Sequence, residues 1–291
     1  MAAGAYCAPS KSPTHPTNVP TGPGGGGSGG GTIAYDPNQK LGPAGYGPQN
    51  FVSAEGRLDY RIDFENDASA TAPAQIVLIS DPLDANFDFS TFELTEIGFG
   101  DILLSIPSGS QYYETTVTFS NNDQTFGVEI MAGINLASGE VYAAFYSIDP
   151  STGLPPEGLI GFLPPEDGTG RGMGYFSYTV QPGANAVTGD EIRNIAYITF
   201  DGAETIPTNA VDPHDPQVGT DPDREALVTI DANIPASEML ALPPETDMRD
   251  FLVEWAGWDN TSGIEGAGVA TYDVYYRQDD GDWMQIGRAH V

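Results

Sequence analysis

Four short stretches decide the fold class of this chain: residues 58–63 (LDYRID), 74–80 (AQIVLIS), 175–180 (YFSYTV) and 191–200 (EIRNIAYITF). Each is rich in β-branched and aromatic residues and is bounded by Gly, Pro, Asn or Asp clusters, as strands usually are. No apolar period of 3.6 residues extends far enough to predict a core helix. The sequence therefore predicts an all-β fold.

The same pattern recurs often enough to predict an antiparallel β-sandwich. We expect strands near residues 58–64, 74–80, 91–97, 111–119, 125–134, 140–148, 174–181 and 192–200. The Pro-rich segment 149–165 cannot join a central ladder, because proline lacks the N–H that pairing requires. It is expected to be a connection.

Composition limits the partners. The chain has 291 residues, of which 40 % are hydrophobic, enough for a core. Its net charge of −31, from 41 acidic and 10 basic residues, opposes binding to nucleic acid and to anionic membrane surfaces. No apolar run approaches the ~18 residues of a membrane helix, so direct membrane insertion is not expected. The acidity fits solubility, adaptation to high salt or binding of divalent cations.

The ends of the chain carry little information about the fold. Cys7 is the single cysteine, which excludes an intrachain disulfide and a thiolate zinc site. Residues 1–20 lack the features of a signal peptide, so any export signal is expected outside this sequence. Residues 286–291 (IGRAHV) match one translated frame of a common sequencing adapter and are interpreted as read-through.

An ordered series of motifs carries a family resemblance. Residues 36–38 (DPN), 58–66 (LDYRIDFEN), 90–100 (STFELTEIGFG) and 189–209 (GDEIRNIAYITFDGAETIPTN) resemble a domain of large bacterial surface and secreted proteins. The series is similar to DUF11-like repeats and to the DUF7619-type domain. The resemblance implies an immunoglobulin-like sandwich that serves as a spacer or adhesive module, and it implies no catalytic residues.

The domain organisation follows from composition and from a second resemblance. Residues 251–255 (FLVEW) and 269–277 (VATYDVYYR) resemble the first strands of a fibronectin type III or immunoglobulin-like domain. The predicted order is a disordered Pro/Gly-rich linker (1–34), the sandwich (35–211), an Asp/Pro hinge with a linker strand (212–235), a truncated second β unit (236–285) and the read-through segment (286–291).

The metal-site prediction rests on four aspartates, Asp212, Asp215, Asp221 and Asp223, which lie within a short segment between the two β units. Carboxylate oxygens are the ligands that Ca²⁺ prefers, and bound calcium would stiffen the hinge. The spacing does not fit an EF-hand, and a plain acidic linker is the alternative. A lesser candidate for calcium binding is the run Asp279, Asp280 and Asp282, but Gly281 within it indicates a hairpin turn in the first place.

No catalytic set is expected. His214 is the only histidine outside the linker and the terminus, and no G-x-S-x-G motif accompanies it. Two carboxylates across a cleft would suffice for glycoside hydrolysis, and the candidates are Glu65, Asp67, Glu93, Glu96, Glu129, Glu166 and Asp167. Aromatic residues that could either stack on sugars or pack in the core are Tyr112, Tyr113, Tyr175, Tyr178, Tyr272, Tyr275, Tyr276 and Trp283.

The sequence thus predicts a non-catalytic structural, spacer or adhesive module of a bacterial cell-surface or secreted multidomain protein. Its expected partners are neighbouring domains of the same polypeptide and surface glycans or proteins; no cofactor other than calcium is implied. The alternative is a carbohydrate-binding accessory module of a secreted enzyme, which would be marked by a coplanar row of exposed aromatics on one sheet. A glycoside hydrolase is the third interpretation, and it would need two carboxylates facing into a cleft.

Overall fold

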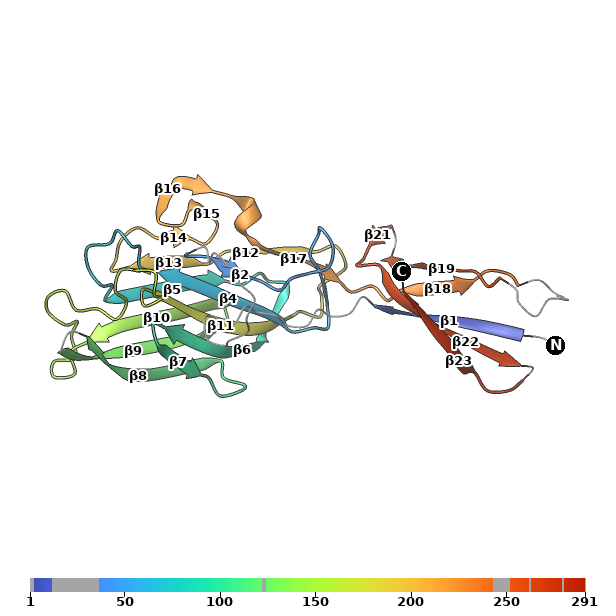
Figure 1. Ribbon diagram of the computed structural model, residues 1–291, viewed down its shortest axis with the longest axis horizontal. Coiled ribbons are helices and arrows are strands. Elements are labelled where there is room, and N and C mark those ends of the chain that lie inside the picture. The colour runs from blue at the N-terminus through green and yellow to red at the C-terminus, as the bar shows by residue number, and fades with distance from the viewer. Residues whose placement is uncertain are drawn as a thin grey trace.

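The computed structural model describes residues 3–11, 37–121, 124–242, 252–261, 263–278 and 280–290, and it is built almost entirely of β-strands (Figure 1). Among these residues the only regular helical element is the 3₁₀ turn η1, Pro222–Arg224. A large sandwich lies at one end of an elongated molecule and a smaller β unit at the other (Figure 1). The all-β prediction is confirmed. No helix of the described residues is long and apolar enough to span a membrane.

Two sheets form the sandwich. The six-stranded sheet has the order β14-β13-β5-β10-β9-β8, and the five-stranded sheet has the order β2-β4-β11-β6-β7. The first comprises Ile206–Pro207, Tyr197–Phe200, Ile76–Pro82, Glu140–Ile148, Gln124–Asn135 and Tyr112–Asn121; the second comprises Lys40–Leu41, Leu58–Glu65, Met173–Pro182, Phe87–Phe99 and Ile102–Ser105. Every pairing in both sheets is antiparallel.

Aromatic side chains fill the space between the sheets. The Phe145 ring lies 5.1 Å from that of Phe64 and 5.6 Å from that of Phe162, measured between centroids. All three residues are buried. Burying a phenylalanine side chain contributes about 1.5–3 kcal/mol, so these strands are held by their inward faces.

The segment expected as a hinge contains a core strand. β15 (Ala210–Asp212) and β16 (Asp215–Thr220) form a hairpin, and after η1 the chain enters β17 (Ala226–Asp231). β17 pairs antiparallel with β12 (Glu191–Asn194) and parallel with β3 (Phe51–Ser53). The sandwich core therefore extends past residue 211 to β17, which lies within the hinge and linker strand expected over 212–235. The reason is the alternation of apolar residues along β17, which places Val228 and Ile230 in the core.

The smaller unit is made of short pairings. β18 (Ala236–Met239) pairs with β19 (Trp255–Trp258), β20 (Asn260–Thr261) with β21 (Ile264–Glu265), and β22 (Val269–Gln278) with β23 (Met284–His290). The hairpin predicted near residue 281 is present. The adapter-like residues 286–290 lie in β23.

The N-terminal segment departs from the predicted disorder. β1 (Ala3–Lys11) pairs antiparallel with β22, so it adds a third strand to the β22–β23 hairpin. The glycine-rich part of the expected linker lies in residues 12–36, outside the described residues.

Candidate functional site

The four aspartates of the predicted calcium site fall into two pairs. Asp212 and Asp215 face each other at the closed end of the β15–β16 hairpin. Asp221 and Asp223 lie beyond the other end of β16, and a strand of this length spans about 20 Å. Three of the carboxylates already accept backbone N–H groups: Asp212 from His214 at 2.9 Å, Asp215 from Gln217 at 3.0 Å and Asp221 from Asp223 at 3.0 Å.

The four carboxylates therefore do not form the single cluster that the sequence predicted. Among the described residues, no group of three or more His, Cys, Asp or Glu residues is arranged to hold a metal ion. The lesser candidate is only partly described: Asp279 lies outside the described residues, and Asp280 and Asp282 are exposed. Calcium binding at either place stays a prediction.

His214 lies between two of the carboxylates considered for glycoside hydrolysis, those of Asp67 and Glu65. Its Nδ1 lies 3.2 Å from Oδ2 of Asp67, and its Nε2 lies 3.9 Å from Oε1 of Glu65. Burial, reinforced by the nearby charges of Glu166 and Asp67, raises the pKa of Glu65 to about 7. The hydrogen bonds from Ser69 lower the pKa of Asp67 below its ordinary value. The group fastens the turn of the β15–β16 hairpin to the end of β4.

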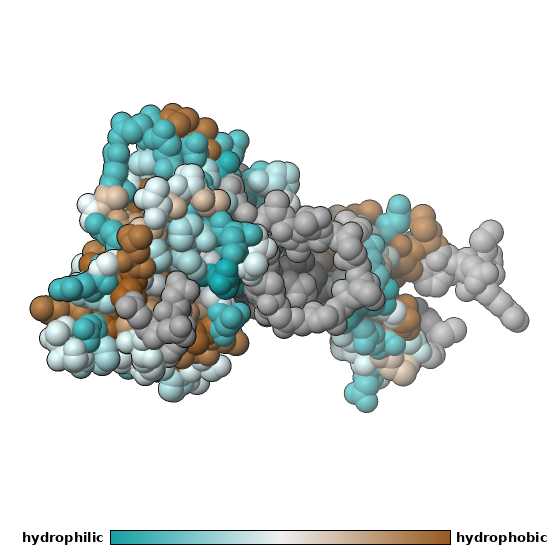
Figure 2. Space-filling view, turned by 60° about the vertical axis from the view of Figure 1, so that its left-hand side comes forward, coloured by the Kyte–Doolittle hydropathy of each residue, from teal (hydrophilic) through white to brown (hydrophobic). Residues whose placement is uncertain are grey.

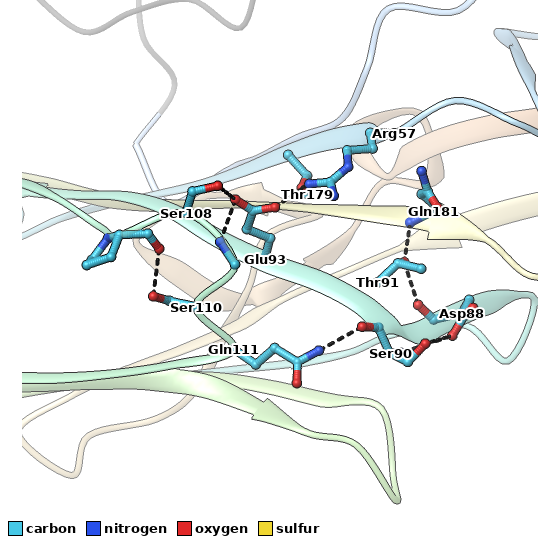
Figure 3. Close-up of polar contacts among 12 residues, drawn as sticks. Arg57, Asp88, Ser90, Thr91, Glu93, Ser108, Ser110, Gln111, Thr179 and Gln181 are labelled. Atoms are coloured by element: carbon cyan, nitrogen blue, oxygen red, sulfur yellow. Dashed lines mark hydrogen bonds and ion pairs between the residues drawn. The ribbon is translucent and has the colours of Figure 1, made fainter.

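Glu93 holds a loop in place (Figure 3). It accepts the Ser108 hydroxyl at 2.9 Å and the Gly109 N–H at 2.8 Å, and it pairs with Arg57. The hydrogen bond from Arg57, followed by those from Gly109 and Ser108, lowers the pKa of Glu93 to about 2. Since the carboxyl stays ionised at neutral pH, it cannot serve as the general acid of a glycoside hydrolase.

The other hydrolase candidates have similar structural contacts. Glu166 accepts the N–H groups of Gly168, Gly170 and Gly172 at 2.7–2.8 Å and so shapes the loop before β11. Asp167 pairs with Arg171 at 2.5 Å, Glu96 accepts the Tyr175 hydroxyl, and Glu129 is half-buried on β9. A pocket of about 310 Å³ opens beside β2, and none of the seven candidate carboxylates lines it.

A buried polar centre lies between the sheets, and sequence reasoning missed it. Lys40 of β2 donates to both Asp81 carboxylate oxygens at 2.6 Å and to the Tyr178 hydroxyl at 2.9 Å. The Tyr178 hydroxyl in turn donates to Asp81 Oδ2 at 2.7 Å. The Lys40 and Asp81 side chains are both 0 % exposed. Lys40 comes from the five-stranded sheet and Asp81 from the six-stranded sheet, so the contact crosses the core.

Aromatic rings surround this centre. Lys40 Nζ lies 4.9 Å from the centroid of the Tyr60 ring, which stacks on Tyr178 at 5.5 Å. Burial lowers the pKa of Lys40 to about 8, and the Asp81 charge opposes the shift. Burial and the Asp81 charge raise the pKa of Tyr178 well above its ordinary value. The Tyr60 hydroxyl is buried and has no hydrogen-bond partner among the described residues.

The sequence held one faint signal of this centre. Asp81 continues the inward-facing alternation of Val77 and Ile79 in β5, where an apolar residue is expected. Lys40, by contrast, stands in a polar stretch (DPNQKLG, 36–42) that is typical of an exposed turn. Only the pairing of β2 with β4 turns it inward.

A second feature is a row of tyrosines across the outer face of the six-stranded sheet. The register aligns Tyr112, Gly133, Tyr142, Ser80 and Tyr197 from β8 to β13. Tyr112 is 51 % exposed and Tyr197 is 40 % exposed. Gly133 and Ser80 separate the tyrosines in the register, and the Tyr112 ring lies close to Gly133, where an added Cβ would be 3.2 Å from it.

The aromatics singled out from sequence divide between core and surface. Tyr178 and Tyr272 are buried, Tyr113 packs against the core, and the Arg61 guanidinium lies 3.7 Å from the centroid of Tyr175. Tyr275 is half-buried, and Tyr276 and Trp283 are exposed on the smaller unit. Over the face of the sandwich seen in Figure 2, hydrophilic and apolar residues are interspersed.

Comparison with known families gives a match to the first part of the sandwich. Residues 36–131 match the family model described as Domain of unknown function (DUF7619). The predicted resemblance to DUF7619 is confirmed over this segment, which includes Lys40 and Asp81. No curated protein matches the chain.

Solved structures give distant likenesses. A 35 kDa C-terminal fragment of the major pilin GBS80 of Streptococcus agalactiae is 10 % identical, with 86 % of this chain and 90 % of that one covered, at a TM-score of 0.36. ACE19, the collagen-binding subdomain of the Enterococcus faecalis surface protein ACE, is 9 % identical (68 % and 97 % covered; TM-score 0.28). A type II cohesin domain from the Acetivibrio cellulolyticus cellulosome is 9 % identical (61 % and 81 % covered; TM-score 0.23). The fold assignment rests on the strand pairing described above.

Proposed function

We propose that this chain is a non-catalytic structural module of a bacterial surface or secreted multidomain protein, where it spaces or presents neighbouring domains outside the cell. The proposal rests on one observation: the charged side chains make contacts that hold parts of the sandwich together. Glu93 and Glu166 fix loops, Glu65 and His214 fasten a hairpin, and Lys40 with Asp81 joins the two sheets. These contacts add rigidity to an already packed core.

The connectivity also suits a load-bearing role. β3 near the start of the sandwich runs parallel to β17 at its end. Tension between the two ends of the sandwich would pull these neighbouring strands in opposite directions along their axes. Their hydrogen bonds would then be loaded together instead of opening one at a time.

Force spectroscopy of the full chain, held by handles at its two ends, tests this function. We expect the sandwich to resist extension and then to unfold in one step. Val228→Ala, which weakens the packing of β17, should lower the unfolding force, whereas the exposed-site control Val218→Ala should leave it unchanged. Gradual extension without a force peak would contradict a spacer role.

A second candidate function, binding of carbohydrate, is supported by a different feature of the sandwich. The row formed by Tyr112, Tyr142 and Tyr197 supports glycan binding, because Tyr112 and Tyr197 are exposed and Tyr142 is half-buried between them in the same register. Neighbouring strands lie about 4.8 Å apart, so successive tyrosines in the row are spaced at about 10 Å. Flat rings at such intervals can stack on successive sugars of an extended polysaccharide.

Retention of the chain on insoluble cellulose and chitin tests the second function. If the row binds glycan, the Tyr112→Ala, Tyr197→Ala double variant should lose at least about tenfold in affinity, because stacking on two rings is removed. Tyr46→Ala is the matched control, since Tyr46 is 60 % exposed and lies outside the row. Equal retention of both variants, or no retention of the unaltered chain, would rule out this function for these two polysaccharides.

A further inference from the structure

The Lys40–Asp81 contact brings an amine nitrogen close to a carboxyl carbon. Nζ lies 2.6 Å from each carboxylate oxygen, which places the carboxyl carbon between them at about 3 Å from the nitrogen. Such a separation is that of a near-attack arrangement, although the carboxyl plane must turn for the nitrogen to approach its face. Both side chains are fully buried, so no water competes for the carboxyl carbon.

We propose that Lys40 and Asp81 condense into an intramolecular isopeptide bond that covalently joins the two sheets of the sandwich. The bond would connect β2 to β5 across the core and would close a loop containing β3 and β4. The inference goes beyond the proposed function and does not depend on it. Once formed, the bond would carry tension directly from β2 to β5 and past β3, so loading of the β3–β17 ladder applies to chain in which the bond has not formed.

The reaction balances without any co-reactant. A proton first passes from the Lys40 ammonium to an Asp81 oxygen, which gives a neutral amine and a neutral carboxylic acid. The amine lone pair forms the N–C bond, the C–O bond to the protonated oxygen breaks, and that oxygen leaves as water with a second proton from the nitrogen. Of the three ammonium hydrogens, one remains on the amide and two leave in the water.

Tyr178 is placed to carry the second proton. Its oxygen accepts from Lys40 Nζ at 2.9 Å, while its O–H donates to Asp81 Oδ2 at 2.7 Å. The hydroxyl can therefore take a proton from the attacking nitrogen and give its own to the departing oxygen in one movement. General acid–base assistance of this kind typically accelerates a reaction by about 10²–10⁴-fold.

The surroundings favour the product over the ion pair. Burying two charges is expensive even when they pair, and the Tyr178 hydroxyl is the neighbouring polar group that hydrogen-bonds both Lys40 and Asp81. An amide is neutral and needs far less solvation. The burial that lowers the pKa of Lys40 acts in the same direction, because it favours the nucleophilic neutral amine.

Mass spectrometry of the purified full chain tests the proposal. The expected result is a mass about 18 Da below that of the sequence, together with a branched peptide containing residues 40 and 81 after proteolysis. Lys40→Met and Asp81→Ala should each restore the full mass. Lys11→Met is the matched control, because Lys11 is the other lysine of the chain, and this variant should keep the loss.

Succinimides at Asp-Gly sequences such as Asp201-Gly202 would also lose water, but mild alkali reopens them and leaves an isopeptide bond intact. A folded, unaltered chain with its full mass, or a loss that persists in Lys40→Met, would overturn the proposal. The relay is tested separately: in chain made by cell-free translation and quenched at intervals, Tyr178→Phe should slow the loss of water by roughly 100-fold. An unchanged rate would remove Tyr178 from the mechanism.

Discussion

The sandwich and the C-terminal β unit are built from similar strands, but they differ in what those strands enclose. The largest fully buried side chains, such as Phe145 and Tyr178, all belong to the sandwich. In the C-terminal unit Trp258, Trp283 and Ile286 are 41 %, 43 % and 63 % exposed. An alternating sequence pattern is therefore enough to form a strand. A stable domain also needs a second sheet that covers the apolar side of the first.

Core truncation should show the largest difference between the two regions. Phe145→Ala removes a ring packed against Phe64 and Phe162, and we expect it to destabilise the sandwich by about 3–5 kcal/mol. Trp283→Ala, in the C-terminal unit, should change the same transition by less than about 0.5 kcal/mol. Urea unfolding followed by far-ultraviolet circular dichroism measures both. Equal losses would mean that the two regions unfold as one body.

Acidity should affect the sandwich through Glu65. Its folded pKa of about 7 lies above the ordinary value of 4.5, so the folded state binds this proton more tightly than the unfolded chain does. Stability is then lost as pH rises from about 4.5 to 7. Solvent around the partly exposed carboxyl limits the effect to about 1 kcal/mol.

Glu65→Gln removes this titration. We expect the variant to be more stable than the unaltered chain at pH 8 and equal to it near pH 4, in thermal melts at matched salt. The control is Glu238→Gln, because Glu238 is exposed in the C-terminal unit. A gain at pH 4 as large as at pH 8 would assign the effect to packing and not to charge.

The surface ion pair of the sandwich should matter less. Arg57→Ala breaks the contact with Glu93 that helps to hold the loop at Ser108, and we expect a loss of about 0.2–1 kcal/mol. The loss should shrink in high salt, where surface charges are screened. Arg288→Ala, which breaks the contact with Asp273 in the C-terminal unit, should leave sandwich unfolding unchanged. A salt-independent loss for Arg57→Ala would indicate that the side chain acts through packing.

Calcium should have the smallest effect. The pairs Asp212/Asp215 and Asp221/Asp223 offer few ligands each, and a site with Kd of about 1 mM adds only about 0.4 kcal/mol at millimolar calcium. Thermal melts with calcium and with chelator measure this shift, and an Asp221→Asn, Asp223→Asn variant controls for it. A much larger shift that disappears in the variant would restore the single stiffening site predicted from sequence.

The sequence predicted the main strands closely, because each is a run of β-branched and aromatic residues bounded by turn-forming residues. The strand expected at 140–148 is β10, and the one expected at 58–64 is β4 with one more residue. The single strand expected at 192–200 is in fact divided: β12 pairs with β17, and β13 joins the six-stranded sheet. Local pattern cannot reveal this change of partner.

The sites were less predictable, because they depend on long-range contacts. Lys40 and Asp81 lie 41 residues apart, and their meeting follows from the packing of two sheets. The tyrosine row is likewise invisible in sequence, because it joins residues of β8, β10 and β13 through their register. The contacts of His214 with Asp67 and Glu65 likewise follow from the fold, because these residues lie far apart in the sequence.

The central claim is that the rigidity of this chain lies in the sandwich, and amide hydrogen exchange of the full chain tests it most directly. We predict that β4, β5, β10 and β11 exchange at least about a hundredfold more slowly than β22 and β23, since strands of a packed core exchange only through large-scale unfolding. Exchange of β22 and β23 as slow as that of β10 would contradict the claim.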